Sequence, residues 1–270
     1  MLAPSFLLGE KMPIDKVAFK GESSIPEHKL PILLATRAEG MYGEVRSFID
    51  PCTPEYMEKL NGLIKTAVVD NDGVFWGMDE KLIMDLSFSA GLERLHRAKI
   101  AGRGGRAGSN EKDPQWMIRR HELGMFGEIT ICAFAGVLFS PKEGTFWGTG
   151  DIGSIGQVRA SRKWKTVENV LYFRGNRLDG KKDEDKSEDF FISVTLQSSP
   201  YIYGAVHGGG FGFEVSNGAN GSVWEQPDRE KERPFCWCTP NSKLPRKQDE
   251  VRNMLRNGDL GLDNLEVMPC

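Results

Sequence analysis

The stretch GMFGEITICAFAGVLF (124–139), followed by GTGDIGSIGQVRAS (148–161), carries the strongest structural signals in this 270-residue chain. The first piece belongs to a run from about 114 to 138 that has the length and apolar content of a helix. On that helix, residues four and seven positions away share the face of Glu128: His121, Gly124, Cys132 and Ala135. Apart from the histidine these side chains are small, so the carboxylate of Glu128 can approach a sheet or an ion closely.

The second piece combines a bend with a short strand. Asp151 lies in the glycine-rich bend, and Gln157 follows six residues later on the strand. Because side chains alternate along a strand, Gln157 and Arg159 share one face and Val158 points to the other. A carboxylate, an amide oxygen and a cation can therefore converge, and Glu128 can close the site from the helix.

Phosphodiester hydrolysis explains why these residue types would occur together. A divalent ion polarises the phosphate and activates water. Magnesium accepts one or two carboxylates together with water and substrate oxygens. A nearby cation then offsets the negative charge of the transition state.

The order Gly-Glu, Asp151 and Gln157-Val158-Arg159 resembles the PD-(D/E)XK nuclease superfamily. The fuller pattern GMFGE…GDIG…QVRAS is similar to that of uncharacterised phage proteins with a GE…D…QVR motif. The resemblance covers roughly residues 118–207, including DFFISVTL and YIYGAVHG. It implies a restriction-endonuclease-like core that cleaves DNA with Mg²⁺ or Mn²⁺. By the same resemblance, Asp151, Gln157, the Val158 carbonyl and Glu128 hold the metal, and Arg159 takes the place of the catalytic lysine.

Two positions depart from the family pattern. Gln157 replaces the usual glutamate, which removes one negative charge and should weaken metal binding. Arg159 replaces the usual lysine, and its planar guanidinium suits phosphate binding better than proton exchange. Two functions therefore stay open. One is metal-dependent hydrolysis of DNA, and the other is an inactive nuclease fold that binds nucleic acid or acts as a phage assembly or interaction protein.

A basic cluster follows the strand in RASRKWK (159–165). Cations beside an aromatic ring suit a nucleic-acid backbone and a stacked base. The candidate nucleic-acid contacts are Arg162, Lys163, Trp164 and Lys165, together with His121 on the helix. The same run is also compatible with an ordinary solvated turn.

The glycine-rich, charged segment 101–113 reads as a linker, which divides the chain into an extension (1–110) and a core (111–270). Helices are expected in the extension at about 53–69 and 79–98, where Thr53 and Pro54 begin the first. In the core, the helix at 114–138 precedes strands near 155–160, 168–174, 189–197, 201–207, 211–215 and 235–239, and a last helix spans 246–256. Residues 174–189 read as a solvated connection and 207–221 as flexible hairpin turns. This order predicts an α/β (α+β) fold with a central mixed sheet flanked by helices.

Composition limits the partners. A net charge of −3 argues against a protein that coats nucleic acid by bulk charge but permits a local basic groove. No apolar run has membrane-spanning length, and the N-terminus lacks the pattern of a signal peptide. The five scattered cysteines favour free thiols in a reducing cytoplasm, that of the host if the protein is viral. DNA is the expected partner, with protein partners or a homo-oligomer also compatible and no membrane association expected.

Overall fold

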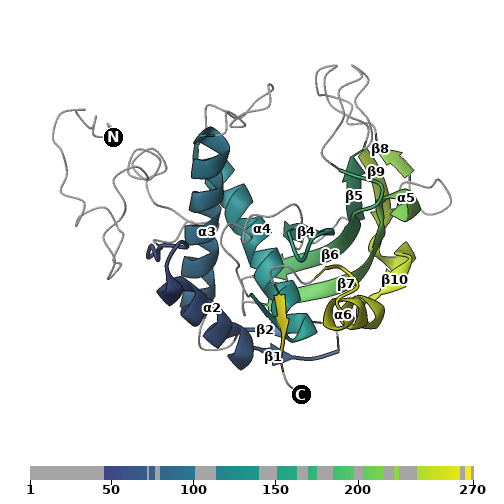
Figure 1. Ribbon diagram of the computed structural model, residues 1–270. Coiled ribbons are helices and arrows are strands. Elements are labelled where there is room, and N and C mark those ends of the chain that lie inside the picture. The colour runs from purple at the N-terminus through teal and green to yellow at the C-terminus, as the bar shows by residue number, and fades with distance from the viewer. Residues whose placement is uncertain are drawn as a thin grey trace, which may run out of the picture.

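The computed structural model describes most of the chain, and its elements are labelled in Figure 1. The described residues are 46–71, 73–76, 80–100, 114–139, 151–162, 170–174, 185–197, 203–215, 222–224, 236–261 and 265–268. The predicted linker at 101–113 and the candidate nucleic-acid contacts Lys163, Trp164 and Lys165 lie outside this part of the chain, as do residues 1–45.

A mixed sheet lies at the centre of the described structure. Its strands follow the order β1 (Val68–Val69), β2 (Gly73–Phe75), β7 (Tyr203–Phe211), β6 (Phe190–Gln197) and β4 (Gly156–Arg162). A sixth strand, β10 (Arg246–Lys247), pairs with the part of β7 that β2 does not reach. Among these pairs only β4 and β6 run parallel. Within the described residues, β4 is an edge strand of the sheet.

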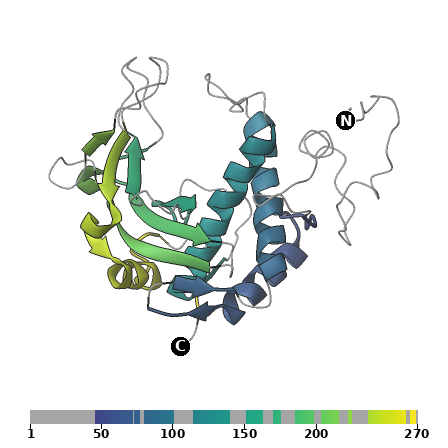
Figure 2. The ribbon, with the colours of Figure 1, turned by 180° about the vertical axis from the view of Figure 1, so that it is seen from behind.

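Three helices stand on one side of this sheet: α2 (Pro54–Thr66), α3 (Glu80–Ile100) and α4 (Pro114–Ala135). Both ribbon views place α4 between α3 and the sheet (Figures 1 and 2). Close packing of α3 on α4 requires Gly91, because a Cβ there would lie 2.6 Å from the Glu122 nitrogen. A fourth helix, α6 (Gln248–Asn257), packs against β7 and α4. The expected mixed sheet flanked by helices is therefore confirmed.

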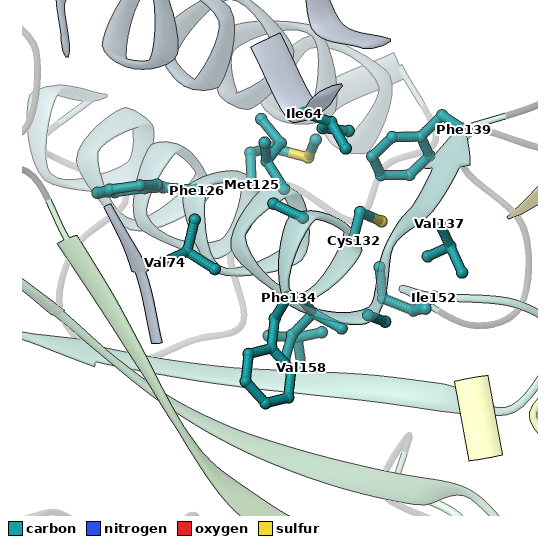
Figure 3. Packing of buried hydrophobic residues seen from close by; sticks show 14 of the residues in the cluster. Ile64, Val74, Met125, Phe126, Cys132, Phe134, Val137, Phe139, Ile152 and Val158 are labelled. Atoms are coloured by element: carbon teal, nitrogen blue, oxygen red, sulfur yellow. The ribbon is translucent and has the colours of Figure 1, made fainter. Parts of the chain in front are cut away.

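Strand alternation divides the buried side chains of β6 between two clusters. Every second residue, from Phe190 to Leu196, packs in the main core with α2, α3 and α4. Phe126, Phe134 and Val158 belong to the same core (Figure 3). Phe191 points the other way, into a smaller cluster with Phe173. The two faces of the sheet therefore have different neighbours, which matters for the polar residues of β4.

Two small sheets complete the described fold. β5 (Val170–Arg174), β9 (Cys236–Pro240) and β8 (Ser222–Trp224) form one, in the order β5-β9-β8. β3 (Val137–Phe139) and β11 (Leu265–Val267) form the other. The side chain of Asn61 on α2 exchanges two hydrogen bonds with the backbone of Phe139, which ties this second sheet to the helical layer.

The predicted helices near 53–69, 79–98 and 246–256 are confirmed to within a few residues. The Thr53 hydroxyl accepts a hydrogen bond from the Tyr56 nitrogen, and Pro54 is the first helical residue, as expected. The helix predicted at 114–138 ends earlier, at Ala135. Gly136 adopts a φ of 66°, and residues 137–139 form β3 instead. The end of that helix was therefore predicted wrongly.

The glycine-rich segment at 207–221 was predicted to form hairpin turns, and its described part differs. β7 continues to Phe211, and residues 212–215 form a short helix, α5 (Gly212–Val215), where a strand was expected. The glycines serve close packing. A Cβ on Gly209 would lie 2.4 Å from the Phe191 carbonyl oxygen, and one on Gly208 would lie 2.2 Å from the Arg246 carbonyl oxygen.

Residues 68–75 belong to the segment that the sequence assigns to the N-terminal extension. In the structure they form β1 and β2, and β2 pairs directly with β7 of the central sheet. Gly73 permits this pairing, because a Cβ there would lie 2.4 Å from the Gly204 carbonyl oxygen. The extension thus contributes strands to the same sheet as the core.

Candidate functional site

The bend that carries Asp151 is a tight turn closed by backbone hydrogen bonds. The nitrogens of Asp151 and Ile152 donate to the Gly156 carbonyl at 2.7 and 3.0 Å, and the Gly156 nitrogen donates back to Ile152 at 3.0 Å. Ile152 is fully buried in the main core and anchors the turn. Gly156 has no room for a side chain, since a Cβ would lie 2.4 Å from the Ile152 carbonyl oxygen. Asp151 is therefore held at the start of β4 by local geometry.

A second contact fixes this turn from outside. The nitrogens of Ser154 and Ile155 both donate to the carbonyl of Leu260, which follows α6, at 3.0 and 3.3 Å. Gly153 has a φ of 64°, and a Cβ there would lie 2.0 Å from the Gly261 carbonyl oxygen. The chain end beyond α6 therefore braces the turn, a contact between segments more than 100 residues apart that no local pattern reveals.

The carboxylate of Asp151 reaches the backbone of β4. Its Oδ2 atom accepts a hydrogen bond from the Val158 nitrogen at 2.9 Å. The N–H and C=O groups of one residue in an extended strand point to the same side. The Val158 carbonyl therefore points, like its N–H, away from β6 and toward the edge of β4 on which no other described strand pairs. A carboxylate and a backbone carbonyl thus face the same edge.

Gln157 and Arg159 share one face of β4, as alternation predicts. Their partners in the parallel register are Phe191 and Ser193 of β6, which point away from α4. The Arg159 guanidinium lies 4.8 Å from the centroid of the Phe191 ring. Its Nη2 donates to Asp185 Oδ1 at 2.6 Å. A charge-assisted contact of this kind is among the stronger hydrogen bonds in proteins.

The amide of Gln157 has an acidic partner as well. Its Nε2 donates to Asp189 Oδ2 at 3.2 Å. Burial is the main cause that raises the pKa of Asp189, while Lys186 and the Gln157 amide oppose that shift. Asp185 and Asp189 belong to the segment expected to be a solvated connection, yet the Asp185 side chain and Asp189 are only 7% and 6% exposed. That expectation holds for the exposed residues 186–188 and is wrong for these two acids.

Sequence reasoning missed both acids because their position depends on pairing. β4 and β6 are parallel, so their N-terminal ends lie at the same end of the sheet. Residues just before β6 therefore lie beside Gln157 and Arg159. The one available signal was the acidic run immediately before the apolar strand DFFISVTL.

Glu128 lies buried on α4, with 2% exposure. One residue of α4 that touches β4 is its neighbour Gly127, where an added Cβ would lie 2.7 Å from the Ala160 Cβ and 3.1 Å from Val158 Cγ1. The face of β4 toward α4 thus carries Val158 and Ala160. Gln157 and Arg159 occupy the opposite face, so the structure does not bring them onto one face with Glu128.

The thiol of Cys132, one turn after Glu128, is fully buried. Burial, and secondly the charge of Glu128, raise the pKa of Cys132 well above its usual value. A neutral thiol in an apolar core is neither a nucleophile nor a strong metal ligand. This group therefore belongs to the packing of α4 against its neighbours (Figure 3).

The remaining candidate contacts are dispersed. His121 is half-buried on α4, two turns before Glu128, and Arg162 is the last residue of β4. A histidine not anticipated from the sequence lies on the sheet itself, where His207 Nε2 is 2.7 Å from Thr195 Oγ1. The β6–β7 register shifts beside His207, and such bulges redirect a side chain.

Among the described residues, no three histidine, cysteine, aspartate or glutamate side chains form a group that would hold a metal ion. Two hard oxygen donors, the Asp151 carboxylate and the Val158 carbonyl, face the same edge of β4. Gln157, on the same strand, carries an amide oxygen. Magnesium needs only one or two carboxylates when water and substrate supply its other ligands. This donor set therefore fits a weakly held magnesium or manganese ion.

Comparison of the chain with protein families, with curated proteins and with solved structures finds no match. Within the described residues, no helix is both long enough and apolar enough to cross a membrane.

Proposed function

We propose that this protein is a metal-dependent phosphodiesterase that acts on DNA, built on a restriction-endonuclease-like core. One observation carries the proposal. Asp151 Oδ2 accepts from the Val158 nitrogen, so a carboxylate and the Val158 carbonyl face one edge of β4. An ion bound there would meet two hard oxygen donors without displacing the pairing of any described strand.

Each residue of the proposed site would have a separate role in binding the metal or the DNA. Asp151 and the Val158 carbonyl would hold Mg²⁺ or Mn²⁺, with Gln157 as a neutral third ligand. When bound, the ion would polarise the phosphate and lower the pKa of a bound water. Arg159 would bind the phosphate oxygens, Arg162, Lys163 and Lys165 would follow the DNA backbone, and Trp164 would stack on a base.

Position 157 holds Gln where the nuclease superfamily that the sequence resembles usually has Glu, and this difference has a measurable consequence for metal binding. An amide oxygen is neutral, so the site carries one negative charge less than a site with two carboxylates. Metal affinity should therefore be low, and activity should require millimolar rather than micromolar metal. Gln157→Glu should lower the metal concentration that gives half-maximal activity, which an assay over a range of Mn²⁺ concentrations measures.

The direct test uses purified protein with supercoiled plasmid and Mn²⁺, followed on agarose gels. Wild-type protein should nick or linearise the plasmid, and Asp151→Asn should abolish this while its carbonyl can still accept from Val158. Asp249→Asn provides a matched control, since Asp249 is an exposed aspartate on α6 and its side chain is 80% accessible. Cutting that survives Asp151→Asn would falsify the site assignment.

A second candidate is a nuclease fold that has lost catalysis and binds nucleic acid, or that serves as a phage assembly or interaction protein. The observation that favours it is the engagement of two polar residues of β4, Gln157 by Asp189 and Arg159 by Asp185. This function predicts DNA binding that is sensitive to salt and indifferent to EDTA. Binding without any cutting at millimolar Mn²⁺ would favour it over the first.

A further inference from the structure

The loop of residues 185–189 covers the face of β4 that carries Gln157 and Arg159. Two carboxylates reach that strand from it, Asp185 to the arginine and Asp189 to the amide. Only one of the two contacts joins opposite charges. The side chains of Arg159 and Asp185 are 18% and 7% exposed, so this ion pair is largely withdrawn from water but open at the arginine.

The loop is held in place by its backbone. The Asp189 nitrogen donates to the Lys186 carbonyl at 3.2 Å, which closes the turn. From α5, the nitrogens of Gly212 and Phe213 donate to the carbonyls of Asp189 and Ser187 at 2.9 and 3.0 Å. The backbone of residues 186–189 is therefore held without the Asp185 side chain, and a rotation of that side chain would release Arg159.

The guanidinium has a support of its own. It lies 4.8 Å from the centroid of the Phe191 ring, on the side away from α4. Contact between a cation and an aromatic face holds a guanidinium without consuming its hydrogen-bond donors. If Asp185 moves away, Arg159 stays in place with its Nη donors available.

A carboxylate and a phosphate present the same chemistry to arginine, two oxygens that share negative charge and accept from the guanidinium fork. We propose that Asp185 acts as a built-in competitor for a nucleic-acid phosphate at Arg159, so that DNA binds only by displacing it. Asp185 thereby sets the affinity and salt dependence of DNA binding. The phosphate site rests on the proposed function, whereas the competition is a property of the Asp185–Arg159 pair and is testable without catalysis.

The experiment measures binding of a fluorescein-labelled 30-base-pair DNA duplex by anisotropy in EDTA, over a range of salt concentrations. Asp185→Asn should bind about five- to tenfold more tightly than wild type. One additional phosphate contact should also steepen the slope of log K against log[salt] by about 0.9. If the asparagine disrupts folding, Asp185→Ser removes the same charge, and melting curves show which variant is folded.

Two controls separate competition from bulk charge. Asp189→Asn removes a negative charge from the same loop but leaves the Arg159–Asp185 pair intact, so its affinity should stay within about twofold of wild type. Arg159→Gln combined with Asp185→Asn should lose the whole gain, because the released cation is absent. Asp185→Glu keeps the carboxylate and should behave as wild type.

The outcomes are decisive in each direction. A gain confined to Asp185→Asn and dependent on Arg159 supports the proposal. No gain, or equal gains for Asp185→Asn and Asp189→Asn, overturns it. Because the binding assay contains EDTA, its result is independent of the plasmid-cutting test with Asp151→Asn. If the protein never cuts DNA but shows the Arg159-dependent gain in affinity, catalysis is refuted and the competition at Arg159 is supported.

Discussion

The contact of Gly127 with β4 makes a quantitative prediction about how closely α4 can approach the site. A methyl group at Gly127 would lie 2.7 Å from the Ala160 Cβ and 3.1 Å from Val158 Cγ1. Carbon atoms pack best at about 3.5–4.0 Å, so the helix and strand would have to separate by about 1 Å. Overpacking of this kind costs about 1–3 kcal/mol, and the better helix propensity of alanine returns about 1 kcal/mol. Gly127→Ala should therefore lower the free energy of unfolding by up to about 2 kcal/mol.

Gly62 on α2 supplies the matched control. It also lies inside a helix but is exposed, and a Cβ there would meet nothing within 4 Å. Gly62→Ala should raise the free energy of unfolding by about 0.5–1 kcal/mol, from propensity alone. The two alanine variants should thus move in opposite directions in urea denaturation followed by circular dichroism.

A double-mutant cycle checks the cause. Adding Ala160→Gly to Gly127→Ala removes the opposing methyl group, so the effects of the two single variants should fail to add, by about 0.5–3 kcal/mol. If Gly127→Ala stabilises the protein as much as Gly62→Ala does, the close contact of α4 with β4 is refuted. Since Val158 lies at that contact and also binds Asp151, plasmid cutting by Gly127→Ala should fall along with stability.

Two further predictions concern the loops beside β4. Burial raises the pKa of Asp189, so the folded state binds this proton more tightly than the unfolded chain does and loses stability as pH rises through the raised pKa. Asp189→Asn cannot ionise, so its Tm should exceed that of wild type above that pKa, with the gap closing in acid; a gap that grows in acid would contradict the stated sign. Gly153→Ala forces a non-glycine residue to a φ of 64° and places its Cβ against the Gly261 carbonyl oxygen. The free energy of unfolding measured with urea should therefore fall by at least about 1–3 kcal/mol, and plasmid cutting should be abolished. A neutral effect would refute the bracing of the turn by the segment after α6.

The local elements of the fold were predictable because their causes are local. Thr53 and Pro54 carry the chemistry of a helix start, and the structure begins α2 there. Alternation along GQVRASR predicts that Gln157 and Arg159 share a face, and the register with β6 has them so. The glycine-rich bend before that strand was also predictable, and it holds Asp151 at the start of β4.

Other local patterns were misleading because tertiary packing overrode them. The run of glycines at 208–210 has the composition of a flexible turn, yet it continues β7. Glycine is required there because atoms of neighbouring segments lie too close to these positions for a Cβ. Residues 73–75 are too short to be identified as a strand alone, and they become one only by pairing with β7. Burial of Glu128 likewise follows from its neighbours and not from its own sequence context.

The sequence alone determined the bend before β4, which residues share a face of that strand, and that a carboxylate precedes it, because these depend on backbone preferences within a few residues. Only the tertiary structure decided which groups meet them. Parallel pairing of β4 with β6 brings Asp185 and Asp189 to Arg159 and Gln157, and Gly127 directs α4 to the opposite face. Such contacts arise from packing between segments that are distant in sequence, so the spacing of residues along one strand cannot predict them.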